Sequence, residues 1–432
     1  MTQTTIRHVH ARQILDSRGR PTVEVDIELS DGSTGRAAVP SGASTGSAEA
    51  HELRDGDASQ YRGLGVTKAV ANVNGEVAAA IEGMDAMDQK GLDQRLVELD
   101  GTAQLKRIGA DGILGVSMAT SRASASASRM PLYARIAEMC GNTAVQLPLP
   151  MVNILSGGLH AGRGMDVQDF LAIPARAGDM AEAIHLMSRV RSSAADVAAE
   201  RGLPTLLADE GGLSPGLQSA QLALDMMLAA IERAGLRPGD DVLIAIDVAA
   251  TALHAANGHY QLAREGRELD SAAMIAMMSG WVDNYPVVSI EDGLDEEDWA
   301  GWQAMTQQLK DRLQIVGDDL FATNRARIEN GIACKVGNGV LVKVNQNGTL
   351  SGTLDVIALA KANGYAPIVS ARSGETEDPF IADLAVGSSA GQIKIGSLRT
   401  SSTVCKYNQL LRIEEHSRAP YVGTAALAGA RR

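Results

Sequence analysis

The sequence is poor in aromatic residues and cysteine, and it has no long apolar run. Phenylalanine, tyrosine and tryptophan make up 3 % of the 432 residues, and there are 3 cysteines. Because Cys140, Cys334 and Cys405 are odd in number and widely spaced, we expect reduced thiols in a cytoplasmic protein. No segment reaches the ~18 apolar residues of a membrane span, and residues 1–16 lack a signal-peptide core, so we expect no membrane association.

The chain also has fewer basic than acidic residues. The chain has 39 Lys and Arg against 52 Asp and Glu, a formal net charge of −13. This balance argues against binding to nucleic acid or to an anionic membrane, because both require a basic face. A protein of this charge that handles an anionic substrate must gather its positive charge locally or use a metal ion.

The first 140 residues contain an alternating segment and a helical segment. Residues 5–40 alternate polar and apolar positions around turn signals, which predicts a small antiparallel sheet. From about residue 65 to residue 138, apolar residues recur at spacings of three and four, which is typical of helices. We therefore expect an N-terminal α+β domain over residues 1–140.

Between these segments lies the loop SGASTG, residues 41–46, which has no hydrophobic anchor. Its small residues fit a flexible surface connection. They equally fit a mobile lid whose backbone amides and hydroxyls close over an anion. The residues alone leave both interpretations open.

From residue 141 onwards, short apolar segments alternate with helical ones. This alternation predicts an α/β fold, and the number of units favours a TIM-like (β/α)8 barrel over residues 141–432. The first two strands follow each other without a full helix, so we expect an irregular start. The expected strands are 151–155, 169–174, 204–209, 242–247, 287–292, 314–319, 340–345, 366–371 and 392–397. The expected helices are 178–201, 216–235, 270–283, 297–311, 324–333, 350–363, 378–389 and 404–416.

Four of these strands, between Val242 and Gln346, carry a charged residue at or near the end. A charge at the end of a buried strand is costly unless something there requires it. Three are carboxylates, which are hard oxygen ligands suited to Mg²⁺, and one is a lysine. In barrels of this class the active site lies at the C-terminal ends of the strands. We predict a metal site formed by Asp247, Glu291 and Asp318, with Lys343 beside it as a base.

Other strand ends and adjoining loops supply further polar side chains. Lys343, Arg372 and Lys394 provide the local positive charge, which suits a carboxylate and a phosphate. The mixture indicates abstraction of a proton next to a metal-bound carboxylate. The remaining candidates are His160, Asp169, Asp209, Glu210 and Ser373.

Several motifs together resemble the enolase family of lyases. They run from about Ile6 to Pro420 and include SGASTG, DEGGLSP, SIEDGLDEEDW, VGDDLF, LVKVNQ, ARSGETED, GQIK and KYNQLLRIEE. The resemblance implies Mg²⁺-dependent dehydration of 2-phospho-D-glycerate to phosphoenolpyruvate. A lysine or histidine base working with one or two Mg²⁺ ions is a known property of the superfamily and is carried over from it.

The resemblance also assigns roles to individual residues. Lys343 takes the C2 proton, and Glu210 assists loss of the C3 hydroxyl. The tighter Mg²⁺ is held by the three strand-end carboxylates, and the second is joined by Ser44 of the loop. A homodimer is implied, with Glu24 and Arg412 at the interface. Residues matching substrate-binding positions are His160, Gln168, Asp169, Arg372, Ser373 and Lys394.

Four positions depart from the family pattern. Asp169 stands in place of Glu, Ala371 in place of a catalytic His, Ser156 in place of Asn and Arg20 in place of Asn. Replacing Glu by Asp withdraws the carboxylate by ~1.5 Å. Loss of one positioned acid–base group typically costs roughly 10²–10⁴ in rate. By resemblance these changes lie near the leaving hydroxyl and the phosphate, away from the C2 proton.

Three functional interpretations follow. The first is dehydration of 2-phosphoglycerate or a close analogue. The second is a specialised paralogue with a bulkier phosphonate or phosphate substrate, such as the carboxyphosphonoenolpyruvate synthase of phosphinate biosynthesis. The third is a non-enzymatic binding protein that keeps the fold. The intact Lys343 and metal ligands argue against the third.

Overall fold

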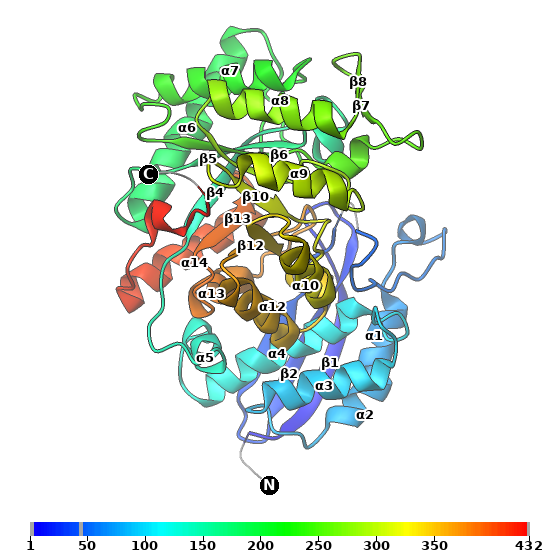
Figure 1. Cartoon of the computed structure of the whole chain (residues 1–432). Helices are drawn as coiled ribbons and strands as arrows, with labels where there is room; N and C mark the ends of the chain where they lie inside the picture. The colour runs from blue at the N-terminus through cyan, green and yellow to red at the C-terminus, as the bar shows by residue number, and fades with distance from the viewer. Residues whose placement is uncertain (1–3, 43–45, 430–432) are drawn as a thin grey trace.

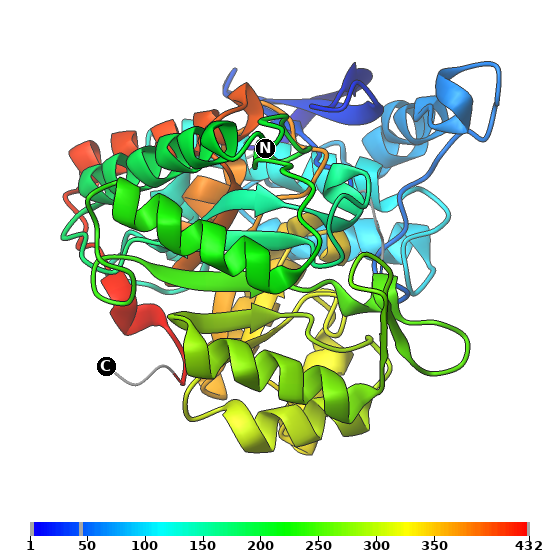
Figure 2. The same ribbon diagram turned by 90° about the horizontal axis from the view of Figure 1, so that it is seen from above.

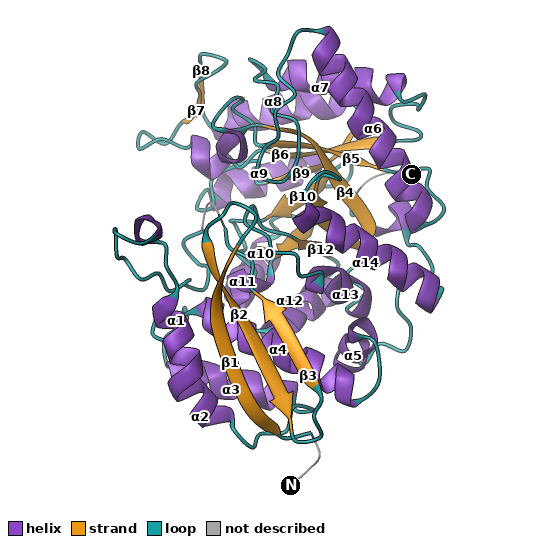
Figure 3. Cartoon of the chain, turned by 180° about the vertical axis from the view of Figure 1, so that it is seen from behind, coloured by secondary structure: helices purple, strands orange, loops and turns teal. Residues whose placement is uncertain are grey.

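Three antiparallel strands begin the chain in the computed structural model, which describes residues 4–42 and 46–429. β1 (Ile6–Leu15), β2 (Pro21–Leu29) and β3 (Thr34–Ala38) pair in that order. Helices cover one face of this sheet (Figure 3), so the predicted α+β arrangement is present. These helices are α1 (Thr67–Asn72), a π-helical turn (Val73–Val77), α2 (Ala78–Ile81), α3 (Gln89–Asp100), α4 (Ala110–Ala127) and α5 (Leu132–Met139).

Helix α4 lies directly on the sheet because its facing residues are small. A Cβ atom added at Gly115 would lie 2.6 Å from Val25 Cγ2. On the other side of the contact, a Cβ atom added at Gly35 would lie 2.1 Å from the carbonyl oxygen of Ala119. Neither position can accept a larger side chain without movement. The close contact between α4 and the sheet therefore requires small residues at these positions.

The rest of the chain forms a closed eight-stranded barrel, as predicted. Around the barrel the strands follow the order β4, β5, β6, β9, β10, β11, β12 and β13 before closing on β4. Their bounds are β4 (Leu149–Ser156), β5 (Asp169–Ile173), β6 (Leu243–Asp247), β9 (Val287–Glu291), β10 (Gln314–Gly317), β11 (Gly339–Val342), β12 (Ala366–Ser370) and β13 (Gln392–Gly396).

The irregular start of the barrel is confirmed and takes a specific form. β5 runs antiparallel to both β4 and β6, whereas the other pairings are parallel. The short connection between β4 and β5 holds only a 3₁₀ turn (Gly158–Ala161), which is too short for a parallel crossover. As a result, Asp169, the first residue of β5, lies at the same end of the barrel as the last residue of β6.

The strand predicted at 204–209 is wrong, because this segment is a loop with an isolated β-bridge between Leu207 and Leu213. Leu206 is 71 % exposed and Leu207 47 %, so the apolar run that suggested a buried strand lies at the surface. A short hairpin, β7 (Tyr260–Leu262) and β8 (Arg267–Leu269), was not predicted.

The predicted helices of the barrel are all present within a few residues, and they surround the strands (Figure 2). A further short helix follows Lys343. No helix in the described ranges is long and apolar enough to span a membrane. The bounds are α6 (Met180–Glu200), α7 (Ala220–Arg233), α8 (Ser271–Asn284), α9 (Trp299–Leu309), α10 (Arg325–Cys334), α11 (Val344–Asn347), α12 (Leu350–Ala362), α13 (Phe380–Gly387) and α14 (Ser401–Ser417).

The N-terminal part lies against the barrel (Figure 1). Both apolar and charged side chains contribute to the contact. One buried apolar cluster runs from Ile6 to Ile413 and includes side chains of both parts. Arg122 of α4 forms an ion pair with Asp378, which precedes α13. This ion pair joins the N-terminal part to the barrel.

Candidate active site

The predicted metal ligands converge at the C-terminal end of the barrel strands. Asp247 and Glu291 are the last residues of the neighbouring strands β6 and β9 and stand directly opposite each other. Asp318 follows the end of β10. All three carboxylates are buried. The barrel topology therefore brings together three acids that lie far apart in the sequence.

Lys394, in β13, joins two of these carboxylates. Its Nζ donates to Asp247 Oδ2 at 2.8 Å and to both carboxylate oxygens of Glu291 at 2.8 Å. The resemblance predicts a substrate contact for this lysine, and the structure places its ammonium among the acids themselves. A cation is thus already balancing part of their charge.

Lys343 follows β11 and forms an ion pair with Asp318. Asp318 also accepts a hydrogen bond from Gln346 Nε2 at 3.0 Å. Burial is the largest single effect and acts against the charge of Lys343, but Asp318 and Glu291 act in the opposite direction, and the pKa of this ammonium is raised above its usual value. The neighbouring cations Arg372 and Lys394 lower the pKa of Lys343, but the net shift is upward.

The acids repel one another strongly. Burial and the neighbouring Asp247 raise the pKa of Glu291 well above its usual value. Burial also disfavours the charge of Asp247, but Lys394 outweighs it and lowers the pKa of that carboxyl to about 2. A set of buried oxygen donors with this excess of negative charge suits a hard divalent cation. The side chains therefore fit Mg²⁺.

Asp292 is a further buried acid beside the predicted metal ligands. It was not predicted from the sequence, although it directly follows Glu291. Its carboxylate accepts hydrogen bonds from the backbone N–H groups of Asp318 at 2.8 Å and Asp319 at 2.9 Å. One oxygen of each of these three acids lies within 4.8 Å of the others, a spacing that could hold a metal ion. Asp292 has a φ of 44°, a costly backbone conformation for a non-glycine residue.

A second cluster lies at the start of the barrel. His160 Nδ1 lies 3.1 Å from Asp169 Oδ2 and 3.8 Å from Glu210 Oε1. Asn153 Nδ2 donates to the other oxygen of Asp169 at 2.7 Å. Burial opposes the charge of His160, but Glu210 and Asp169 raise its pKa to about 9. The imidazole therefore carries a positive charge at neutral pH, between two acids.

The two clusters meet around one small cavity. Gln168 links them, since its Nε2 donates to Asp247 Oδ2 at 3.2 Å. Ala371, 5 % exposed, lines the cavity where the family pattern has a histidine. The cavity wall also includes His160, Gln168, Glu210, Asp247, Asp292, Asp318, Asp319, Lys343, Arg372, Ser373 and Lys394.

Arg372 and Ser373, which follow β12, complete the positive side. Arg372 Nη1 donates to Glu49 Oε2 at 3.0 Å and to Asn345 Oδ1 at 2.8 Å. Ser373 Oγ accepts from Arg18 Nη1 at 3.2 Å. Glu49 and Arg18 come from the N-terminal part and were not predicted as site residues. Nothing in their local sequence marks them, because only the packing of the two parts brings them here.

Three further residues from the sequence have different outcomes. Ser44 lies outside the described residues. Ser156, where the family has Asn, is fully buried and accepts from Asn153 Nδ2 at 3.1 Å. Asp209 lies away from this cavity and lines a hollow on another face.

Comparison with known proteins agrees with this architecture. Residues 6–136 match the family model for the enolase N-terminal domain, and residues 144–429 match that for the enolase C-terminal TIM barrel domain. The chain belongs to the enolase family. It is 50 % identical over 410 residues to the enolases of Tropheryma whipplei strains Twist and TW08/27, covering 95 % of each chain. The enolase resemblance seen in the motifs is thus confirmed.

Proposed function

We propose that this enolase-family chain uses Lys343 and Glu210 as the base and acid of an enolase reaction. The overall activity is that of a hydro-lyase, the dehydration of 2-phosphoglycerate to phosphoenolpyruvate. The observation that carries the assignment is that Lys343, Glu210 and His160 line the same cavity, with His160 Nδ1 3.8 Å from Glu210 Oε1.

Lys343 would take the C2 proton at Nζ. Its ammonium is held by Asp318, so it must lose its proton before it can act as a base. Glu210, which lines the same cavity, would deliver a proton to the leaving C3 hydroxyl. Burial raises the pKa of Glu210 above its usual value, which favours the protonated acid that this step needs.

Asp247, Glu291 and Asp318 would hold Mg²⁺, with Ser44 joining a second ion. Bound Mg²⁺ would stabilise the negative charge that develops on the substrate carboxylate when the C2 proton leaves. Lys394, Gln168, Arg372 and Ser373 would bind and orient the carboxylate and phosphate. His160 and Asp169 would fix the position of Glu210.

The comparisons favour 2-phosphoglycerate dehydration over a specialised paralogue or a non-enzymatic binding protein. Ala371 and Asp169 remain the positions at which substrate choice would differ. In Asp169 both carboxylate oxygens are engaged, by Asn153 and His160. The Asp169 carboxylate therefore orients the side chains of Asn153 and His160.

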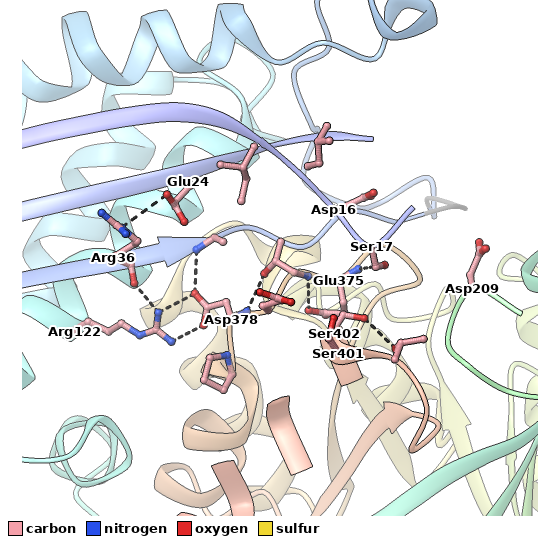
Figure 4. A pocket seen from close by; sticks show the side chains of 17 residues that line it. Asp16, Ser17, Glu24, Arg36, Arg122, Asp209, Glu375, Asp378, Ser401 and Ser402 are labelled. Carbon is pink, nitrogen blue, oxygen red and sulfur yellow. Dashed lines mark hydrogen bonds and ion pairs between the residues drawn. The ribbon is translucent and has the colours of Figure 1, made fainter. Parts of the chain in front are cut away.

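We further propose two domains, 1–140 and 141–432, with residues 41–46 as a lid, in a cytoplasmic homodimer. Glu24 lines a hollow of about 630 Å³ whose wall is formed by the N-terminal sheet and by residues that follow β12 and β13 (Figure 4). The guanidinium groups on its wall, Arg36 and Arg122, are outnumbered by carboxylates. Arg412 is exposed on α14, so the same arginine of a second copy would find an acidic partner at this hollow. The carboxylates are Asp16, Glu24, Asp209, Glu375, Glu377 and Asp378.

The function is tested by adding 2-phosphoglycerate and Mg²⁺ to the purified protein. Absorbance from phosphoenolpyruvate should rise, and a chelator should stop the rise until Mg²⁺ is restored. No absorbance change at any Mg²⁺ concentration would reject the reaction.

A further inference from the structure

Glu49 is a buried carboxylate of the N-terminal part that contacts Arg372 of the active site. It is 6 % exposed and lies three residues after Gly46. The next residue is tied to the barrel, because the Ala50 N–H donates to the carbonyl oxygen of Gln346 at 2.9 Å. The Glu49 side chain is thus held where the N-terminal part meets the strand ends.

Donor groups of three residues converge on this one carboxylate. Arg372 Nη1 donates to Oε2 at 3.0 Å. Gln346 Nε2 donates to Oε1 at 3.2 Å, and the Gly46 N–H donates to the same oxygen at 2.9 Å. An ionised carboxylate has only acceptors and can satisfy all three, whereas an amide of the same shape would place its own N–H donors against them.

The contacts of Glu49 connect the substrate-binding residue Arg372 with the residues around the base Lys343. Gln346 shares its Nε2 between Glu49 and Asp318, the latter at 3.0 Å. Thr323 fixes the amide orientation by donating to Gln346 Oε1 at 2.7 Å. Asp318 is in turn the ion-pair partner of Lys343. A chain of hydrogen bonds therefore leads from the Arg372 guanidinium through Glu49 and Gln346 to the base.

We propose that Glu49 is a positioning residue of the dehydration reaction. It holds the Arg372 guanidinium against Asn345 and keeps the Gln346 amide turned toward Asp318. The inference rests on the proposed function of this site. Glu49 acts through Arg372 and Gln346, and it does not itself touch the reacting atoms.

The first test is the variant Glu49→Gln, followed by steady-state kinetics with 2-phosphoglycerate and Mg²⁺. Misplacement of a positioned group by about 1 Å can cost about 10²-fold, so we expect kcat to fall by about 10–100-fold. KM should rise by a smaller factor than kcat falls, because Lys394, Gln168 and Ser373 still bind the substrate when Arg372 is displaced. An unchanged kcat, or a lower KM with kcat retained, would show that Glu49 only competes with the substrate for Arg372.

Two companion variants sharpen this test. Glu49→Asp keeps an acceptor-only group and should retain more activity than Glu49→Gln, which also covers the case in which Glu49→Gln fails to fold. Glu296→Gln is the matched control, because Glu296 accepts from the Ser47 backbone N–H at 3.3 Å and belongs to none of the contacts argued above. Equal losses in Glu49→Gln and Glu296→Gln would overturn the proposal.

The coupling to Arg372 is tested in the background of Arg372→Gln. If Glu49 acts through Arg372, adding Glu49→Gln to that variant should change kcat much less than it does in the wild type. Full additivity of the two losses would contradict this route.

A crystal structure of Glu49→Gln separates this proposal from the assignment of the reaction. The Arg372 guanidinium should leave Asn345 Oδ1, and an unmoved Arg372 would reject the positioning role. This result does not depend on turnover. A wild-type protein without turnover would instead reject the proposed function and leave the structural comparison decisive for Glu49.

Discussion

Ala371 and Asp169 place smaller side chains in the active site than the His and Glu of the family pattern. The Asp169 carboxylate is fully buried between Asn153 and His160, at 2.7 and 3.1 Å. Ala371 presents only a methyl group to the cavity. The imidazolium of His160 is a cationic donor beside Glu210. Asp169 and Ala371 depart from the family pattern, whereas Lys343 keeps it.

The double variant Ala371→His with Asp169→Glu tests whether this side limits the rate. A restored acid–base group typically changes a rate by roughly 10²–10⁴, and we expect kcat for 2-phosphoglycerate to rise toward that range. Steady-state kinetics should be compared with Ala371→Leu, which fills the space without adding a donor. Equal rates for the histidine and leucine variants would show that bulk alone matters.

At the scale of single elements, α14 is fixed to the loop after β12 by a buried ion pair. Lys406 Nζ lies 2.9 Å from Glu375 Oε2, with side-chain exposures of 0 % and 5 %. Glu375 also accepts from the backbone N–H of Arg372 at 3.0 Å. The pair thereby supports the loop that carries Arg372 and Ser373.

Lys406→Met should destabilise the fold, because it leaves the Glu375 carboxylate buried without its cation. Breaking one partner of a buried pair costs about 3–5 kcal/mol, which denaturant unfolding monitored by circular dichroism would detect. The control is Arg325→Met, which removes an exposed partner of Glu329 and should cost no more than about 1 kcal/mol. Similar losses for both variants would contradict the assigned role of burial.

The start of α4 carries a second buried acid with a measurable effect. Asp111 accepts from the Leu53 N–H at 3.1 Å, and burial raises its pKa from 3.8 to about 7. The folded chain therefore keeps this proton to a higher pH than the unfolded chain does. The contribution of Asp111 is favourable at low pH and is lost as the pH rises from about 4 to about 7.

Asp111→Asn should remove this dependence, since an amide carries no charge and still accepts from Leu53. The wild-type free energy of unfolding should fall between pH 5 and pH 8 relative to the variant, by no more than about 3 kcal/mol. Urea unfolding at several pH values measures the difference. Parallel pH profiles for the two proteins would show that Asp111 is ionised in both states.

At the scale of the whole molecule, hydrophobic periodicity predicted most of the helices and strands. It failed at 204–209, where an apolar run lies exposed, because periodicity carries no information on what covers a segment. Asp247, Glu291, Asp318 and Lys343 could be predicted because a charge at the end of a buried strand is unusual. Glu49 could not, because its importance arises only where the N-terminal part meets the barrel.

The proposed dimer is also a property of the whole molecule. Arg412→Glu should shift the protein from twice the chain mass to the chain mass in light scattering, because it places a carboxylate against the acidic hollow around Glu24. The exposed Arg312→Glu, away from that hollow, serves as control and should leave the mass unchanged. A monomeric wild type, or a dimeric Arg412→Glu, would reject this interface.

Exchange of the C2 proton tests the central claim most directly. Incubation of 2-phosphoglycerate with the protein and Mg²⁺ in deuterated water, followed by NMR, isolates proton abstraction from loss of the hydroxyl. The wild type should exchange the C2 proton, and Lys343→Ala should abolish exchange while still binding Mg²⁺. Exchange that persists in Lys343→Ala would show that another group is the base, and no exchange in the wild type would contradict the proposed chemistry.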